Sequence, residues 1–168
     1  MATQQRSRVA ILAGEKKVIA ESGNYESNML DIAARAQVSR ATVYNHFADK
    51  EEMMAALLES EIERLYQLAV SAANVEAALF VLSREISTDP ALATMVQTDP
   101  TDITKFVTVG IHPMWSKVAQ GLNEIFGASA APMILRWLLG QVASPLSESE
   151  SREQAGMLAR AINSDASK

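Results

Sequence analysis

Residues 28–47 read NMLDIAARAQVSRATVYNHF, and this stretch decides the fold of the N-terminal part of the chain. The apolar spacing predicts a helix over residues 28–36, a turn of about four residues, and a second helix over residues 39–47. The positions expected to form a small core between the two helices are Ile32, Ala33, Ala36, Val38 and Val43. Ala33 is small enough for the helices to cross closely. The stretch therefore predicts a helix-turn-helix unit.

The second predicted helix carries side chains suited to DNA. Ser39 can cap it through the side-chain hydroxyl. The positions between its apolar residues are Arg40, Ala41, Thr42, Tyr44, Asn45 and His46. All of these except Ala41 form hydrogen bonds or contact phosphates. Arginine can pair with guanine, asparagine with adenine, and threonine with a thymine methyl group or a phosphate. The pattern predicts that this helix enters the major groove of double-stranded DNA.

Composition and charge narrow the class of protein. The 168 residues fit one domain, or a small module fused to a second packing unit. With no cysteine, a disulfide scaffold, a thiolate metal site and a cysteine nucleophile are excluded. The net charge of −5 argues against indiscriminate coating of nucleic acid. Residues 1–50 nevertheless carry seven basic and five acidic side chains, whereas residues 51–168 carry eight basic and fifteen acidic ones.

The rest of the chain is also predicted to be helical, so the fold class is all-α. Helices are expected over residues 6–21, from Glu51 onward, and over 75–87, 90–98, 103–126 with a break at 110–113, 130–142 and 147–162. The most apolar stretch, residues 130–140, contains Arg136 and is shorter than the ~20 residues of a membrane span. The N-terminus lacks the apolar core of a signal peptide. We expect a soluble cytoplasmic protein.

The N-terminal part of the sequence resembles a known family. Residues 8–58 are similar to the DNA-binding head of TetR-family transcriptional regulators. The matching motifs are Asp31-Ile32-Ala33, Ala36-Gln37-Val38-Ser39, Thr42-Val43-Tyr44, His46-Phe47 and Lys50-Glu51. Three residues depart from the family pattern. Gln37 replaces the usual turn glycine, at a cost on the order of 1 kcal/mol if the turn needs a positive φ. Glu15 and Lys16 stand where relatives usually carry alanine and a large apolar residue.

The resemblance implies roles for individual residues. Thr42, Tyr44 and His46 match positions that contact DNA, and Lys50 opens the next helix beside the backbone. Arg40 and Ala41 match the variable positions that tend to set sequence preference. Ser27 and Asn28 match a pair that typically holds a phosphate at a helix start. The DNA-binding set implied by the motif and the resemblance is Ser27, Asn28, Ser39, Arg40, Ala41, Thr42, Tyr44, Asn45, His46 and Lys50.

The resemblance also implies two domains with different functions. Residues 1–50 would form the helix-turn-helix DNA-binding domain, joined by a long helix to an effector-binding and dimerisation domain over residues 51–168. The residues proposed to line a pocket for a small apolar ligand are Tyr66, Phe80, Met95, Phe106, His112, Met114 and Trp115. The residues proposed for the dimer interface are Met133, Ile134, Trp137, Leu138, Leu158 and Ile162. For both sets, ordinary core packing within the monomer is the alternative.

These observations favour a homodimeric transcriptional regulator. The expected form is a repressor that binds an inverted-repeat operator and is released by a small molecule, with no cofactor and no metal. The alternative is a helical interaction protein of the same fold that has lost DNA or ligand binding. An enzyme is the weakest hypothesis, because the sequence shows no metal cluster, no nucleophile–base pair and no phosphate loop.

Overall fold

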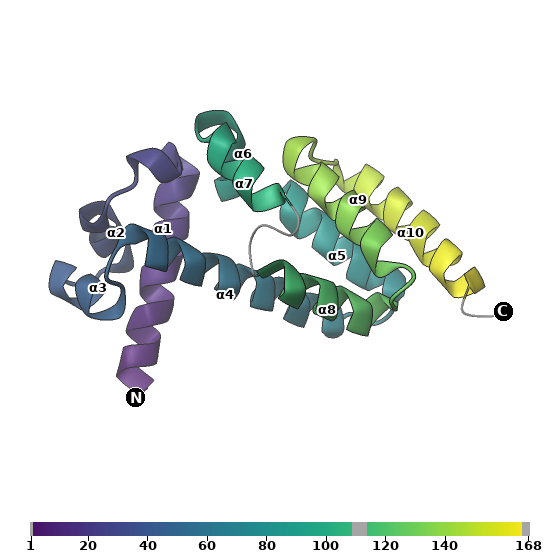
Figure 1. The fold of residues 1–168 in the computed structure, drawn as a ribbon, viewed down its shortest axis with the longest axis horizontal. Coiled ribbons are helices and arrows are strands. Elements are labelled where there is room, and N and C mark those ends of the chain that lie inside the picture. Colours follow the sequence, from purple (N-terminus) through teal and green to yellow (C-terminus); the bar gives the residue numbers. More distant parts are fainter. Residues whose placement is uncertain (1, 109–113, 166–168) are drawn as a thin grey trace. The chain divides into compact units, whose positions relative to one another are not determined.

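The computed structural model describes residues 2–108 and 114–165. All regular elements within these ranges are helices (Figure 1), which confirms the predicted all-α class. They are α1 (Ala2–Glu26), α2 (Met29–Ala36), α3 (Arg40–His46), α4 (Lys50–Val70), α5 (Val75–Ser87), α6 (Pro90–Thr98), α7 (Pro100–Val107), α8 (Met114–Phe126), α9 (Ala131–Ala143) and α10 (Glu148–Asp165). The break predicted at residues 110–113 lies outside the described residues.

The chain forms two compact units. The first contains Met1–Glu61 and Pro90–Ile103, and the second contains Ile62–Asp89 and Thr104–Lys168. The first unit therefore includes all of α6, which the sequence analysis assigned to the effector domain. The domain boundary proposed at residue 50 divides the chain by function, whereas these units divide it by packing. The boundary therefore stays a prediction.

The first unit is built around α1. Residues from α1 to α4 and from α6 bury their apolar side chains against one another, and these include Ile11, Ile19, Ile32, Val43, Phe47, Met53 and Met95. Helices α1 and α2 approach closely at Gly14, where an added Cβ would lie 2.9 Å from the backbone nitrogen of Ala36. A side chain at residue 14 would push the two helices apart, so this small residue fixes the position of α2.

The end of α1 is held by α6. Gly23 interrupts the helical geometry with φ 80° and ψ 172°, two residues after the predicted helix end at residue 21, and a further turn follows up to Glu26. An added Cβ at Gly23 would lie 2.6 Å from Oδ2 of Asp99. The backbone N–H of Asn24 donates to the same Asp99 carboxylate at 2.9 Å, and the Thr94 hydroxyl donates to the Ala20 carbonyl at 2.8 Å. These contacts tie α6 to the turn that precedes α2.

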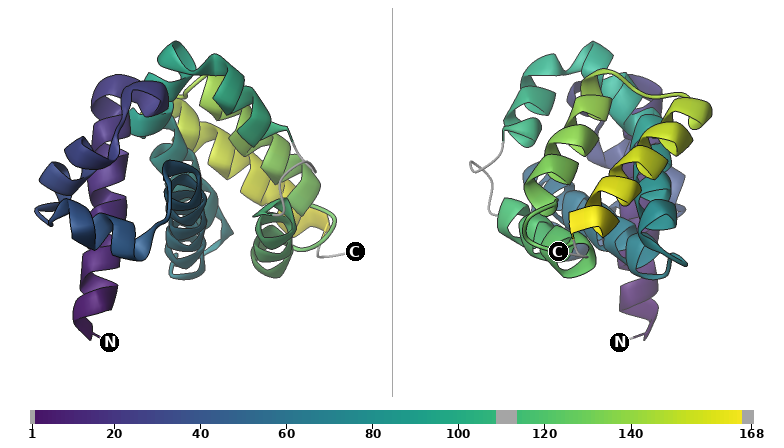
Figure 2. Two further views of the ribbon diagram at one scale, coloured as in Figure 1. Left: turned by 60° about the vertical axis from the view of Figure 1, so that its left-hand side comes forward. Right: turned by 90° about the vertical axis from the view of Figure 1, so that its right-hand side faces the viewer.

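The second unit packs α5 against α9 and α10 (Figures 1 and 2). Its core includes Leu79, Leu82, Leu122, Phe126, Ile134, Leu138 and Ala155. A buried polar contact crosses this core, because the Ser83 hydroxyl lies 2.7 Å from Oε1 of Gln141 and 2.9 Å from the Ser151 hydroxyl. One side chain from each of the three helices thus meets at a single point.

No single described helix is long and apolar enough to cross a membrane. Helices α8 and α9 reach the required length and hydropathy only when taken together, and they are bent by 118°. Leu122, Phe126, Ile134 and Leu138 of this pair lie in the core of the second unit.

One carboxylic acid lies inside the first unit. Glu15 is fully buried, and neither of its carboxyl oxygens has a hydrogen-bond partner among the described residues. Burial raises the pKa of Glu15 to about 8, although the positive charge of Lys50 opposes the shift. Because its pKa exceeds that of the unfolded chain, the folded protein binds an extra proton between about pH 4.5 and 8. The free energy of unfolding should therefore fall as the pH rises through this range.

We predict that Glu15→Gln makes the protein more stable than the wild type at neutral pH. The gain should grow by up to about 1.4 kcal/mol for each pH unit between 4.5 and 8, because the amide does not ionise. Urea unfolding of both proteins across this range measures the gain. Glu51→Gln, at an exposed position in the first turn of α4, is the matched control and should show no such growth. A gain at Glu15 that is independent of pH would contradict the prediction.

Candidate nucleic-acid interface

The side chain of Asn28 caps the N-terminus of α2. Oδ1 of Asn28 accepts hydrogen bonds from the backbone N–H groups of Leu30 and Asp31, both at 3.0 Å. Ser27 is buried, and its hydroxyl donates to the Asn24 carbonyl at 2.9 Å. Asn28 therefore caps α2. Since both side chains already have protein partners, a phosphate contact at Ser27 and Asn28 stays a prediction.

The turn between α2 and α3 requires a left-handed residue. Gln37 has φ 55° and ψ 40°, and it is the one residue other than glycine with a positive φ in the described part of the chain. The N–H of Val38 donates to the Ala33 carbonyl at 3.0 Å, which closes the end of α2. The strain predicted for glutamine at this position is therefore present in the structure.

Helix α3 separates buried from exposed side chains as the sequence predicts. Val43 and Phe47 face the core, whereas Ser39, Arg40, Ala41, Tyr44 and Asn45 are exposed and Thr42 and His46 are half-buried. The Ser39 oxygen accepts from the N–H of Thr42 at 3.1 Å, so the predicted cap is confirmed. The Arg40 guanidinium lies 5.4 Å from the centroid of the Tyr44 ring, which places an arginine and a phenol side by side on the outer face.

Lys50 is half-buried, whereas the resemblance implies a lysine that contacts the DNA backbone. Its ammonium group donates to the carbonyls of Asn24 and Ser27, the latter at 3.0 Å. Desolvation lowers the pKa of Lys50, and the negative charges of Glu15, Asp99, Asp102 and Glu26 oppose the shift. In this structure Lys50 joins the start of α4 to the turn before α2. Its proposed contact with the DNA backbone stays a prediction.

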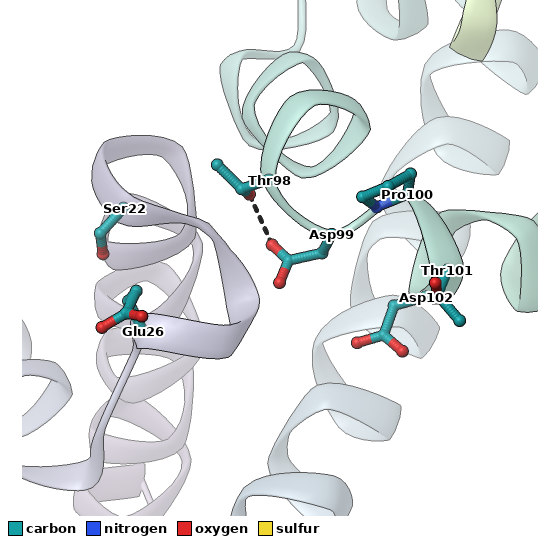
Figure 3. A pocket seen from close by; sticks show the side chains of 7 residues that line it. All are labelled: Ser22, Glu26, Thr98, Asp99, Pro100, Thr101 and Asp102. Atoms are coloured by element: carbon teal, nitrogen blue, oxygen red, sulfur yellow. Dashed lines mark hydrogen bonds between the residues drawn. The ribbon is translucent and has the colours of Figure 1, made fainter.

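A pocket of about 510 Å³ opens beside this turn in the first unit. Its lining is Ser22, Glu26, Thr98, Asp99, Pro100, Thr101 and Asp102 (Figure 3). The Thr98 hydroxyl donates to Asp99 at 2.6 Å, and Asp99 and Asp102 both accept hydrogen bonds from Asn24. These carboxylates therefore serve to hold the end of α1. None of the residues predicted to bind an apolar ligand lines this pocket.

The residues predicted to line a ligand pocket belong to both compact units, and their role stays a prediction. Met95 lies in the core of the first unit, whereas Tyr66, Phe80, Phe106, Met114 and Trp115 belong to the second, and His112 lies outside the described residues. The Tyr66 hydroxyl donates to Glu124 at 2.9 Å, and the Arg152 guanidinium covers the Phe80 ring at 4.2 Å.

Trp115 differs from the rest of that set. The side chain is buried, and its Nε1–H has no hydrogen-bond partner among the described residues. A buried donor without an acceptor is costly, which keeps Trp115 a candidate for contact with a bound molecule.

The residues predicted for the dimer interface divide into core and surface positions. Ile134 and Leu138 are buried within the second unit, so core packing explains them without a partner. Trp137, Leu158 and Ile162 are partly buried against the same core, and Nε1 of Trp137 donates to Gln154. Met133 is 45% exposed. Met157 of α10 is 53% exposed and was not predicted for this interface, because only the orientation of α10 reveals its exposure.

The geometry of α2, the turn and α3 is that of a helix-turn-helix DNA-binding unit: a capped first helix, a left-handed turn, and a second helix with a polar outer face. Residues 11–57 match the family described as bacterial regulatory proteins, tetR family. Residues 11–57 are therefore similar to the DNA-binding domain of tetR-family transcriptional regulators. The resemblance noted in the sequence is thereby confirmed.

Solved structures share the fold over nearly the whole chain. The TetR family repressor AlkX from Dietzia sp. strain DQ12-45-1b, implicated in biodegradation of n-alkanes, has a TM-score of 0.64 at 17% identity, over 94% of this chain and 95% of that chain. The putative transcriptional regulator SCO7518 from Streptomyces coelicolor A3(2) has a TM-score of 0.59 at 19% identity, over 92% and 98% of the two chains. A putative TetR-family regulator from Mesorhizobium loti MAFF303099 has a TM-score of 0.53 at 20% identity, over 95% and 96%. No curated protein matches the sequence.

We predict that Gln37→Gly stabilises the protein. Glycine adopts a φ of 55° without the steric cost that a side chain incurs, so the free energy of unfolding should rise by about 1 kcal/mol. Gln37→Ala is the control, because it removes the polar group and keeps the Cβ. Chemical unfolding of the three proteins measures the difference. Equal stability of the glycine and alanine variants would show that the turn stores no strain.

Proposed function

We propose that the protein is a homodimeric repressor that binds an inverted-repeat operator through α3 and is released by a small apolar ligand. The observation that carries this proposal is the outer face of α3, where Arg40, Tyr44 and Asn45 are exposed while Val43 fixes the helix to the core. These side chains can pair with base edges and phosphates in a major groove. The similar structure AlkX is a repressor, which supports repression as the direction of regulation.

The exposed surface of α9 and α10 supports the proposed dimer. Met133 and Met157 are among the few large apolar side chains that stay exposed in the described residues, and they lie on these two helices. Covering them with the same surface of a second copy removes apolar area from water. A two-fold dimer would present two copies of α3 and read an operator with half-sites ~34–36 Å apart or slightly more.

The proposed ligand release rests on Trp115. The buried Nε1–H of Trp115 points to a molecule that offers a hydrogen-bond acceptor in otherwise apolar surroundings. A ligand regulates only if it binds one conformer better than the other. We place the protein in the cytoplasm with its DNA, and we assign it no catalytic activity, cofactor or metal.

A helical interaction protein that has lost DNA binding is the second candidate. The strained Gln37 and the buried Glu15 favour it, because both weaken the domain that would hold DNA. Selection of genomic fragments by the purified protein at near-physiological salt separates the two candidates. An enriched inverted repeat supports the repressor. A folded, dimeric sample that enriches nothing, with and without small-molecule extracts of the source cells, would support the interaction protein.

We predict that Arg40→Ala and Tyr44→Phe act differently on operator binding. Loss of Arg40 should weaken binding about 5- to 100-fold and relax the preference at one base pair, because a paired arginine discriminates between bases by ~1–3 kcal/mol. Loss of the Tyr44 hydroxyl should weaken binding to all sequences alike, because a phosphate contact carries no base information. Lys117→Ala, at an exposed position of α8, is the control. Fluorescence anisotropy on the selected operator and single-base variants measures both effects. Unchanged affinity in both variants would remove α3 from the interface.

We predict that Met133→Lys together with Met157→Lys converts the dimer to a monomer. Two buried charges per subunit would cost far more than the apolar contacts contribute. Sedimentation velocity at micromolar concentration measures the state. Val70→Lys is the matched control, since Val70 is a similarly exposed apolar residue (52%) on α4. If the double variant remained dimeric, α9 and α10 would not form the interface.

A further inference from the structure

Arg8 of α1 lies beside the C-terminal end of α3. Its guanidinium carbon is 4.8 Å from the centroid of the Phe47 ring. Phe47 follows α3 directly and is nearly fully buried, and its N–H closes the helix by donating to the Val43 carbonyl at 3.0 Å. The Phe47 ring in turn lies 6.2 Å from the ring of His46. His46, Phe47 and Arg8 therefore form a continuous row from α3 to the first turns of α1.

Within the described part of the chain, no partner uses the hydrogen-bonding capacity of Arg8. The described residues supply no hydrogen bond and no ion pair to this side chain, and its described contact is the Phe47 ring. Other arginines are paired with carboxylates, as Arg35 is with Glu21 and Arg64 is with Glu85. The five N–H donors of a guanidinium lie in the plane of the group. They therefore stay available when its face packs on an aromatic ring. Arg8 is therefore oriented by packing and is still able to bind an anion.

Resting on the proposed function, we propose that Arg8 is a further DNA-binding residue, which holds a backbone phosphate next to the end of α3. The Phe47 ring is the platform that fixes the guanidinium, so little side-chain entropy is lost when the phosphate binds. A guanidinium donates two parallel N–H bonds to a phosphate, and this contact carries no base preference. Arg8 would thus add affinity and orientation to the sequence recognition supplied by Arg40 and Asn45.

A measurement of salt dependence tests this role. The variant Arg8→Met keeps an unbranched apolar stem on Phe47 and removes the charge. The matched control is Arg152→Met in the second unit, which also stacks on a phenylalanine, at 4.2 Å from the Phe80 ring. The probes are a fluorescein-labelled duplex that carries the selected inverted repeat and a duplex of shuffled sequence. Anisotropy titrations over a series of KCl concentrations give the slope of log affinity against log salt for each variant.

The expected result for Arg8→Met is a shallower slope, by about 0.9 for each phosphate lost and so by nearly 2 for a dimer. Affinity should fall about tenfold on both duplexes, with unchanged preference between them. Arg8→Lys should recover most of the slope and only part of the affinity, because an ammonium keeps the charge without the paired donors. Arg152→Met should match the wild type. Thermal unfolding of Arg8→Met shows whether the domain stays folded.

The outcomes are distinguishable. Tight binding by the wild type with an unchanged slope in Arg8→Met would overturn the role of Arg8 and leave the proposed function intact. A lower melting temperature with an unchanged slope would show that Arg8 only covers Phe47. A wild-type protein that binds neither duplex would overturn the proposed function, and the role of Arg8 with it.

Discussion

The first unit depends on the ammonium group of Lys50. It donates to the backbone carbonyls of Asn24 and Ser27, between the end of α1 and the start of α2. The carboxylates of Asp99 and Asp102 accept hydrogen bonds from Asn24. One ammonium group and two carboxylates thus bind Asn24 and Ser27, at the end of α1 and just before α2. Because α2 begins directly after this turn, the ionic cluster fixes where α2 starts. The position of α2 in turn sets the orientation of α3.

Much of this arrangement could be predicted from the sequence. The helix-turn-helix, the caps at Asn28 and Ser39 and the exposed face of α3 follow from local spacing and short-range hydrogen bonds, which adjacent residues determine. The role of Lys50 could not be predicted, because its partners are backbone carbonyls, which have no residue signature. Met157 and the Arg8–Phe47 contact were missed for a related reason: both depend on how a helix is rotated against a distant segment.

The pocket prediction relied on residue type, and it stays a prediction. Met95, Tyr66 and Phe80 are all large and partly apolar, yet Met95 fills the core of the first unit and the other two have different polar partners. Similarly, α9 is apolar on most of its surface, but Ile134 and Leu138 find cover inside the monomer. Composition gives the amount of apolar surface to be buried, and only the packing of helices shows which neighbour buries it.

The contact among Ser83, Gln141 and Ser151 has a consequence for the mechanics of the second unit. A purely apolar interface between helices can slide by small steps, since one methyl group replaces another. Here a displacement of any of the three helices would leave a hydroxyl or amide buried without a partner, at a cost of about 1–3 kcal/mol for each group. The three helices are therefore held in one register, and the unit should respond to force or to a bound molecule by moving as a rigid body.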